Sequence, residues 1–148
     1  MEDRYLFRGK RIDNGEWAVG QYVNTCYPGN DKETRYFIVV YPNKYHEIYT
    51  STICQCTGLK DKNGKLIWEN DLVKDLFSDM IAPIRYGSYQ NCFDSTKTEN
   101  VGFYVDWSVT DKKYMRKDLG YWINMVDAEV IGNTFDNPEL LEGGEEDA

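Results

Sequence analysis

The sequence has little of what most membrane proteins and many enzymes need. Its 148 residues include a single histidine, His46, and no stretch that approaches eighteen apolar residues. No apolar run follows basic residues near the first residue, so the sequence predicts neither a signal peptide nor a membrane span. We therefore expect a cytoplasmic protein.

The four cysteines, Cys26, Cys54, Cys56 and Cys92, are expected to be free thiols in that compartment. Cys54 and Cys56 are two residues apart, which on a strand places both on one face. A zinc site would need Cys26 and Cys92 to converge on this pair, because His46 alone cannot complete a mixed ligand set. We favour small buried side chains over a metal site, and we expect no metal and no cofactor.

Catalytic chemistry has equally little support. Cys54 or Cys92 could in principle be paired with His46 as a nucleophile and base, but a lone histidine on a strand is more often structural. Carboxylates are numerous and no general acid and base pair stands out among them. A small hydrolase using Cys/His or carboxylates stays an alternative, and a non-catalytic protein is favoured.

Aromatic and β-branched residues dominate the apolar set, with twelve Tyr, six Phe and four Trp, and this favours strands. Asn14-Gly15 and Asn63-Gly64 each separate strand-like segments, and Asn-Gly supplies the positive φ angles of a tight hairpin turn. No convincing helix-period segment of ten residues is present. Pro138 suits the first position of a single closing helical turn, with Asn137 as its N-cap. We expect strands at 4–9, 16–23, 34–41, 45–57 (as one or two), 65–68, 72–77, 80–86, 101–107, 121–126 and 129–135.

The stretch TGLKDKNGKLIWENDLV (57–73) resembles a binding loop, but its spacing fails for known loops. With Gly64 at the sixth position of an EF-hand, Leu59 would stand first and Asn70 last, where carboxylates are needed. Neither glycine-rich phosphate motif is present. Turn chemistry accounts for Asn63-Gly64 and for a corner at Asp71, so the stretch is interpreted as scaffold.

The net charge of −8 is distributed unevenly along the chain. Residues 142–148 (EGGEEDA) hold four carboxylates and no cation, and we expect an acidic disordered tail there. The balance of the remaining charge argues against a nucleic-acid partner, which needs a basic face.

Three segments together resemble the YopX family of bacteriophage and prophage proteins. They are FRGKRIDNGEWAVGQYV (7–23), QCTGLKDKNGKLIWENDLV (55–73) and EVIGNTFDNPELL (129–141). Asn70 stands where the family usually has glycine, and because asparagine tolerates the left-handed conformation the corner can survive. Cys56 stands where an aromatic is common. The family signature falls on Asn14, Gly15, Thr57, Gly58, Asp61, Asn63, Gly64, Asp71, Gly132, Asn133 and Pro138.

The resemblance implies a phage accessory protein with a mainly β, antiparallel hairpin or barrel-like fold. It also implies a single domain over 1–141, with possible halves 1–57 and 58–141, the second of them SH3-like. It transfers no catalytic residues.

Our functional hypothesis is a non-catalytic module that binds or sequesters a target in the host bacterium. The surplus of aromatic residues, which are favoured at interfaces, also suggests pairing with a second copy of the chain. A host protein is one possible target. A small signalling nucleotide is the alternative, and it would be held by Arg8, Lys10, Arg11 and Trp17.

Overall fold

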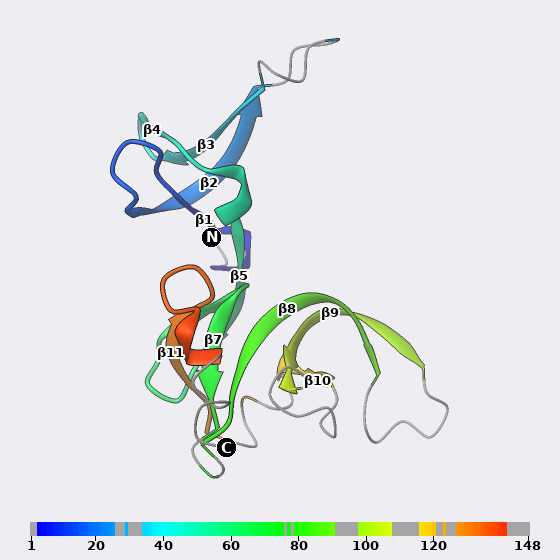
Figure 1. Ribbon diagram of the computed structural model, residues 1–148. Helices are drawn as coiled ribbons and strands as arrows, with labels where there is room; N and C mark the ends of the chain where they lie inside the picture. Colours follow the sequence, from blue (N-terminus) through cyan, green and yellow to red (C-terminus); the bar gives the residue numbers. More distant parts are fainter. Residues whose placement is uncertain are drawn as a thin grey trace. The chain divides into compact units, whose positions relative to one another are not determined.

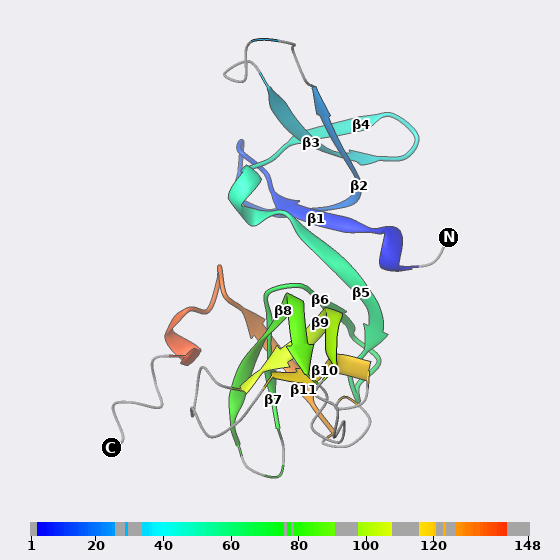
Figure 2. The same ribbon diagram turned by 90° about the vertical axis from the view of Figure 1, so that its right-hand side faces the viewer.

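The computed structural model describes residues 3–25, 29, 34–75, 77, 79–90, 98–107, 116–120, 123 and 127–141. Their contacts divide the chain into two compact units, Met1–Gly58 and Leu59–Ala148, and each is described by itself (Figures 1 and 2). Both are built from antiparallel strands, which confirms the mainly β expectation. Residues 142–148, the expected acidic tail, lie outside the described part of the chain.

The first unit is a run of five strands with a 3-10 turn before the last. Its elements are η1 (Asp3–Tyr5), β1 (Phe7–Lys10), β2 (Trp17–Thr25), β3 (Arg35–Val40), β4 (Lys44–Glu47), η3 (Thr50–Thr52) and β5 (Cys54–Lys60). The strands are ordered β4-β3-β2-β1-β5, so the last strand pairs with the first. β5 carries the boundary between the units, and β6 (Leu66–Trp68) pairs with it.

The first sheet closes on itself just beyond β1. Arg11 and Ile48 form an isolated antiparallel bridge. Around it, Ile12 N donates to Glu47 O and Tyr49 N donates to Lys10 O, each at 2.9 Å. The end of β4 thereby returns to the end of β1, which gives the barrel-like character expected from the sequence.

The interior of this small barrel holds Ala18, Ile38 and Ile48. Two glycines allow close packing there, Gly20 against backbone and Gly9 against a side chain. A Cβ on Gly20 would lie 2.3 Å from the backbone oxygen of Val39, and one on Gly9 would lie 2.5 Å from Cδ1 of Ile48. The partly buried side chains packed against this cluster are Phe7, Tyr22, Tyr36, Val40 and Ile53.

The strands of the second unit follow the same order as those of the first. The order in its five-stranded sheet is β10-β9-β8-β7-β11, so the last strand again lies beside the first. This order is consistent with the expectation that the second half is SH3-like. Helical residues 119–120 precede the last strand, as η3 precedes β5. The strands are β7 (Asp71–Lys74), β8 (Ile81–Gln90), β9 (Glu99–Asp106), β10 (Arg116–Asp118) and β11 (Glu129–Asn133).

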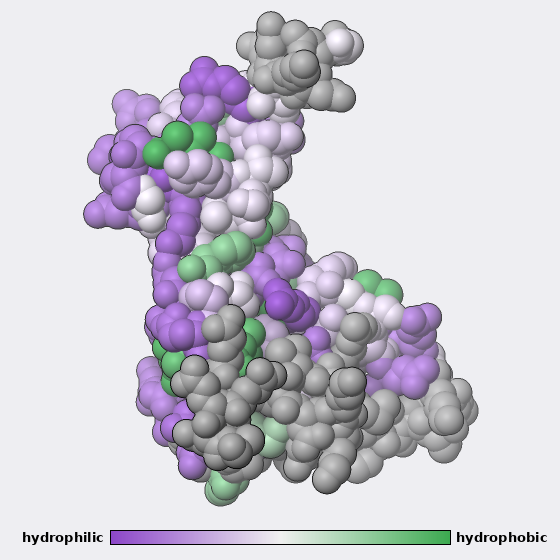
Figure 3. All heavy atoms as spheres, in the orientation of Figure 1, coloured by the Kyte–Doolittle hydropathy of each residue, from purple (hydrophilic) through white to green (hydrophobic). Residues whose placement is uncertain are grey.

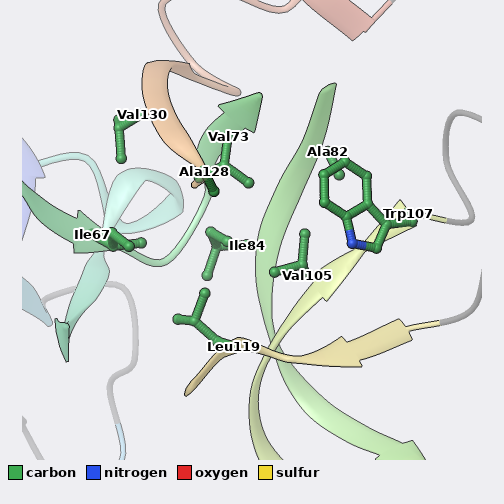
Figure 4. Close-up of a cluster of buried hydrophobic side chains, with 9 residues drawn as sticks. All are labelled: Ile67, Val73, Ala82, Ile84, Val105, Trp107, Leu119, Ala128 and Val130. Atoms are coloured by element: carbon green, nitrogen blue, oxygen red, sulfur yellow. The ribbon is translucent and has the colours of Figure 1, made fainter. Parts of the chain in front are cut away.

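The core of the second unit is formed by side chains of β7, β8, β9 and β11, together with residues close to these strands in the sequence (Figure 4). Ile67, Ala82 and Ile84 are fully buried, and burial of each large aliphatic side chain contributes about 1.5–3 kcal/mol. The other members are Val73, Val105, Trp107, Leu119, Ala128 and Val130.

β8 and β9 form a long curved ribbon (Figure 1), and two tyrosines pack over its glycines. Gly87 and Gly102 are direct partners in the register. Carbon atoms of Tyr104 and Tyr89 lie 3.5 and 3.7 Å from where Cβ atoms on these glycines would stand. Tyr89 also donates from its hydroxyl to Oδ1 of Asp118 on β10. Burial, with that hydrogen bond and the nearby carboxylate, raises the pKa of Tyr89 to about 12.

The structure differs from the sequence predictions at several places. Residues 4 and 5 of the expected strand 4–9 belong to η1, and residues 50–52 of the expected segment 45–57 form η3. Of the residues in the two Asn-Gly turns only Gly15 and Gly64 have positive φ, so each asparagine lies in the ordinary region and the turns are longer than a two-residue hairpin. The expected strand at 121–126 falls mostly outside the described residues, and its described member Ile123 is helical. β10 was not predicted.

We predict that Gly20→Ala lowers the free energy of unfolding of the first unit by about 1–3 kcal/mol, because the new methyl group meets backbone that cannot move aside. Gly102→Ala is the matched control, since its Cβ would have its nearest neighbour at 3.7 Å. Urea unfolding of the two variants measures both effects. Equal losses in the two variants would contradict the close approach at Gly20.

We predict one late tyrosine step in an absorbance titration, near pH 12, that disappears in Tyr89→Phe and moves to lower pH in Asp118→Asn. Because the folded-state pKa lies above the ordinary value of 10.0, the folded state holds this proton more tightly. The stabilisation is complete below pH 10 and is lost as the pH rises through about 12. An unchanged late step in Tyr89→Phe would show that another group produces it.

Candidate ligand-binding face of the first unit

Strand alternation separates the first sheet into a side that faces the core and a side that faces away from it. Ile38 belongs to the buried cluster, so its register partners Tyr22 and His46 share the inner side. The alternate residues form the other side, which we call the outer face. It comprises Arg8, Lys10, Trp17, Val19, Gln21, Val23, Arg35, Phe37, Val39, Tyr45 and Glu47.

The middle of the outer face is accessible and mostly apolar, with the exposed Gln21 between Val19 and Val23 on β2. Val19 and Val23 are each 43% exposed and Tyr45 is 67% exposed. Phe37 and Val39 lie beside them on β3 and are half-buried. Figure 3 shows one side of the molecule, on which hydrophilic residues predominate and hydrophobic residues form small separate groups.

Two cations gather on one indole at the edge of this face. The guanidinium carbon of Arg8 lies 4.4 Å from the ring centroid of Trp17, and Nζ of Lys10 lies 5.3 Å from the same centroid. Lys10 is the direct register partner of Trp17, and Arg8 is two residues away on the same side of β1. Such cation–π contacts contribute about 0.5–2 kcal/mol each and fix where the charges are held.

Arg35 and Glu47 form the opposite edge. Nε and Nη2 of Arg35 donate to the two carboxylate oxygens of Glu47 at 3.0 Å, and the guanidinium also lies 5.2 Å from the ring of Phe37. The hydrogen bonds from Arg35 hold the pKa of the Glu47 carboxyl below its usual value.

Arg11, the fourth residue of the predicted ligand set, is engaged elsewhere. Its guanidinium donates to both carboxylate oxygens of Asp13, at 3.0 and 2.6 Å. These hydrogen bonds raise the pKa of Arg11 and lower that of Asp13. The structure thus brings Arg8, Lys10 and Trp17 together and places Arg11 with the hairpin turn.

In the second block, the family-signature residue Asp61 makes hydrogen bonds within the protein. The buried carboxylate of Asp61 accepts hydrogen bonds from the backbone N–H groups of Asn63, Lys65 and Val130, at 2.9, 2.9 and 3.0 Å. Burial works against the charged form, but the three hydrogen bonds outweigh it and lower the pKa of Asp61. The loop resembles an anion-binding nest, and its own carboxylate fills it.

The corner after β6 is also held by a buried carboxylate that accepts a hydrogen bond from the backbone. Oδ2 of the buried Asp71 accepts from Trp68 N at 2.8 Å, which closes the turn into β7. Asn70 has φ of 69°, the left-handed conformation expected for a residue that replaces glycine. Its side-chain oxygen accepts from Arg85, which anchors the corner to β8.

The last block folds back on itself. A Cβ on Gly132 would lie 2.4 Å from Oδ1 of Asn137, which accepts from Asn133 N at 3.2 Å. Asn133 Oδ1 in turn accepts from the backbone N–H groups of Phe135 and Asp136. Asn137 therefore braces the turn before the helical residues 139–141, which begin after Pro138 as expected.

Remaining signature residues are also in turns or strands. Gly15 has φ of 73° in the loop after β1, where Asn14 Oδ1 accepts from Glu16 N. Thr57 and Gly58 lie in β5, and the φ of 81° at Gly58 marks a local irregularity in that strand.

The described thiols are not accessible. Cys54 and Cys56 are completely buried, and Sγ of Cys54 donates to the backbone oxygen of Thr52. A thiol without access presents no nucleophile to a substrate. Cys26 and Cys92 lie outside the described residues, and among those that are described no three His, Cys, Asp or Glu side chains form a group able to hold a metal.

We predict that Asp61→Asn lowers the free energy of unfolding of the second unit by about 2–3 kcal/mol, because an amide cannot accept all three hydrogen bonds and loses the charge. Asp127→Asn, at an exposed position, is the matched control. Since the pKa of Asp61 is lowered in the folded state, its contribution is present above the unfolded-state pKa and is lost as the pH falls through the folded value. Urea midpoints measured across the acidic range test this, and a difference between wild type and Asp61→Asn that stayed constant with pH would contradict it.

Comparison with known proteins identifies a family for nearly the whole chain. No curated protein matches it. No helix in the described residues is long and apolar enough to cross a membrane. The family model described as YopX protein matches residues 6–142, a range that includes all three signature blocks. The chain therefore belongs to the YopX family, which is phage-associated.

Proposed function

We propose that this protein is a non-catalytic binding protein that docks on a host protein through the outer face of its first unit. The observation that carries the proposal is the neighbouring apolar group of Val23, Phe37, Val39 and Tyr45 between the two cation–aromatic edges. Val19 lies on the same face, beyond the exposed Gln21. Contiguous exposed apolar side chains with a polar rim mark interaction sites, and Trp, Tyr and Arg dominate their energetics. We place this activity in the cytoplasm of the host bacterium.

The distribution of charge supports a protein target over a nucleic acid. Seven basic and seven acidic residues cancel in 1–58, so the net charge of −8 lies wholly in 59–148. A phosphate backbone would meet strong repulsion from the second unit, and the neutral first unit offers no broad basic surface. A protein surface with local complementarity to the outer face meets neither obstacle.

The nucleotide alternative receives less support. Of its three proposed cations, Arg11 is engaged by Asp13, and only Arg8 and Lys10 converge on Trp17. The enzyme alternative has no accessible thiol among the described residues. Self-association remains part of the proposal, because an exposed face of this kind suits a second copy as well as a host protein.

We predict that Val19→Glu/Val23→Glu reduces retention of a host protein, captured from infected cells on the tagged chain, by about tenfold or more, because a carboxylate buried in an apolar interface is costly. Val101→Glu is the matched control, since Val101 is 70% exposed in the second unit. Quantitative mass spectrometry of the captured proteins, with native mass spectrometry of the purified chain, separates a host target from a second copy. Retention that is equal for the two variants would overturn the proposed function.

A further inference from the structure

The two Asn-Gly pairs of the chain, at 14–15 and 63–64, have a reactivity that the proposed function does not use. We propose that Asn14 is a site of spontaneous deamidation in the folded protein, and that Asn63 is protected by the hydrogen bond from its side chain to Glu129. Both asparagines and the glycines that follow them are exposed. The inference concerns a covalent change of the chain itself, so it does not depend on the docking function.

The reaction is an attack within the chain. The backbone nitrogen of the following glycine loses its proton to water and bonds to Cγ of the asparagine, while the bond from Cγ to Nδ2 breaks and ammonia leaves. Water then opens the resulting succinimide ring at one of its carbonyl groups, which gives aspartate or isoaspartate. Glycine favours this reaction because it has no Cβ to obstruct the attack.

The attacking nitrogens are matched in the two loops. Gly15 N donates to Arg11 O at 2.9 Å, and Gly64 N donates to Asp61 O at 3.0 Å. The two glycines also share the left-handed conformation, with φ of 73° and 81°. A difference in reactivity between the two sites therefore comes from the asparagine side chains and from the neighbouring sequence.

The side chain of Asn14 is held in a reactive arrangement. Its Oδ1 accepts a hydrogen bond from Glu16 N at 2.9 Å, the pattern of an Asx-turn. The ring that this hydrogen bond closes contains both Cγ of Asn14 and the backbone N of Gly15, so the two reacting atoms stay close together. Oδ1 becomes negative as the attack proceeds, and an N–H donor at this distance stabilises the developing charge.

The side chain of Asn63 is held away from its own loop. Its Nδ2 donates to Oε1 of Glu129 on β11 at 3.2 Å, whereas Nδ2 of Asn14 donates within its own loop, to Oε2 of Glu16 at 3.3 Å. Among the described residues no N–H donates to Oδ1 of Asn63. The backbone of Asn63 is fixed as well, because its N–H donates to the buried Asp61. The carboxamide must leave Glu129 before it can turn toward the following glycine.

Deamidation changes the loop that precedes Trp17. A carboxylate at residue 14 cannot donate to Glu16 as the amide does, so it repels that residue, and it adds a negative charge to a unit whose charges cancel. Isoaspartate also adds a carbon atom to the main chain inside the loop, which Arg11 N closes by donating to Glu16 O at 2.9 Å. Since this loop joins β1 to β2, the change occurs next to one edge of the outer face.

The test follows deamidation at both sites in the full-length protein, incubated at mildly alkaline pH. Peptide mapping by mass spectrometry, with chromatography that separates aspartate from isoaspartate, gives the two rates. The same incubation in urea removes the folded geometry and supplies the ratio of rates that the neighbouring sequence alone produces. We expect the ratio of the Asn14 rate to the Asn63 rate to be about tenfold higher in the folded protein than in urea.

Two variants separate the contributions of the side-chain acceptors. Glu129→Ala removes the acceptor of Asn63 Nδ2, and we expect it to raise the Asn63 rate about threefold or more while the Asn14 rate stays unchanged. Glu16→Ala is the matched control. It removes the equivalent acceptor in the first loop but keeps the backbone N–H that holds Oδ1, so we expect an Asn14 rate close to that of wild type.

Three results would overturn the inference. They are an Asn14 that does not react in the folded protein while it reacts in urea, a ratio of rates no higher in the folded protein than in urea, and an unchanged Asn63 rate in a folded Glu129→Ala. Circular dichroism of each variant confirms that it is folded. The ratio measured in wild type tests the proposal whether or not Glu129→Ala folds.

Discussion

The three hydrogen bonds accepted by Asp61 join parts of the chain that are far apart in sequence. Two of them shape the loop that follows β5, and the third holds the N–H of Val130 in the last strand. A buried carboxylate is tolerated only when its charge is satisfied in this way. The same residue therefore fixes the local turn and the position of β11, the strand that pairs with β7 at the edge of the second sheet. The surrounding lysines are exposed, so the basic appearance of this loop is a consequence of its carboxylate being inside.

The outer face follows from an equally simple constraint. Once Ile38 and its neighbours fill the inside of the first barrel, alternation directs every second residue outward. Polar side chains at those positions would suffice for solubility, yet valines, Phe37 and Tyr45 occupy them. Valine and aromatic residues at these positions favour the strand conformation, and the proposed docking function would give them a second role.

Local chemistry was readable from the sequence because it depends on few residues. The hairpin loops at Gly15 and Gly64, the corner at Asn70 and the helical turn after Pro138 all lie where residue types predicted them. The conformations of Asn14 and Asn63 were misjudged, since a two-residue hairpin and a longer loop ending in a left-handed glycine share the same Asn-Gly pair. Of the four residues predicted to hold a ligand, Arg8, Lys10 and Trp17 lie together as the sequence suggested. Arg11 is bonded to Asp13 instead, and this pairing depends on the geometry of the loop. The pairing of the first strand of each sheet with its last, β1 with β5 and β7 with β11, is a long-range event that no local pattern encodes.

Gly58 and Leu59, where the two units meet, lie inside β5 and not in a linker. Most domain boundaries fall in exposed segments crossed by few hydrogen bonds, and they can be cut without loss to either side. Here a cut would interrupt a strand that pairs with both β1 and β6. Evolution cannot easily exchange one half of such a protein for another by recombination at this point, so the two units are expected to be inherited as one piece.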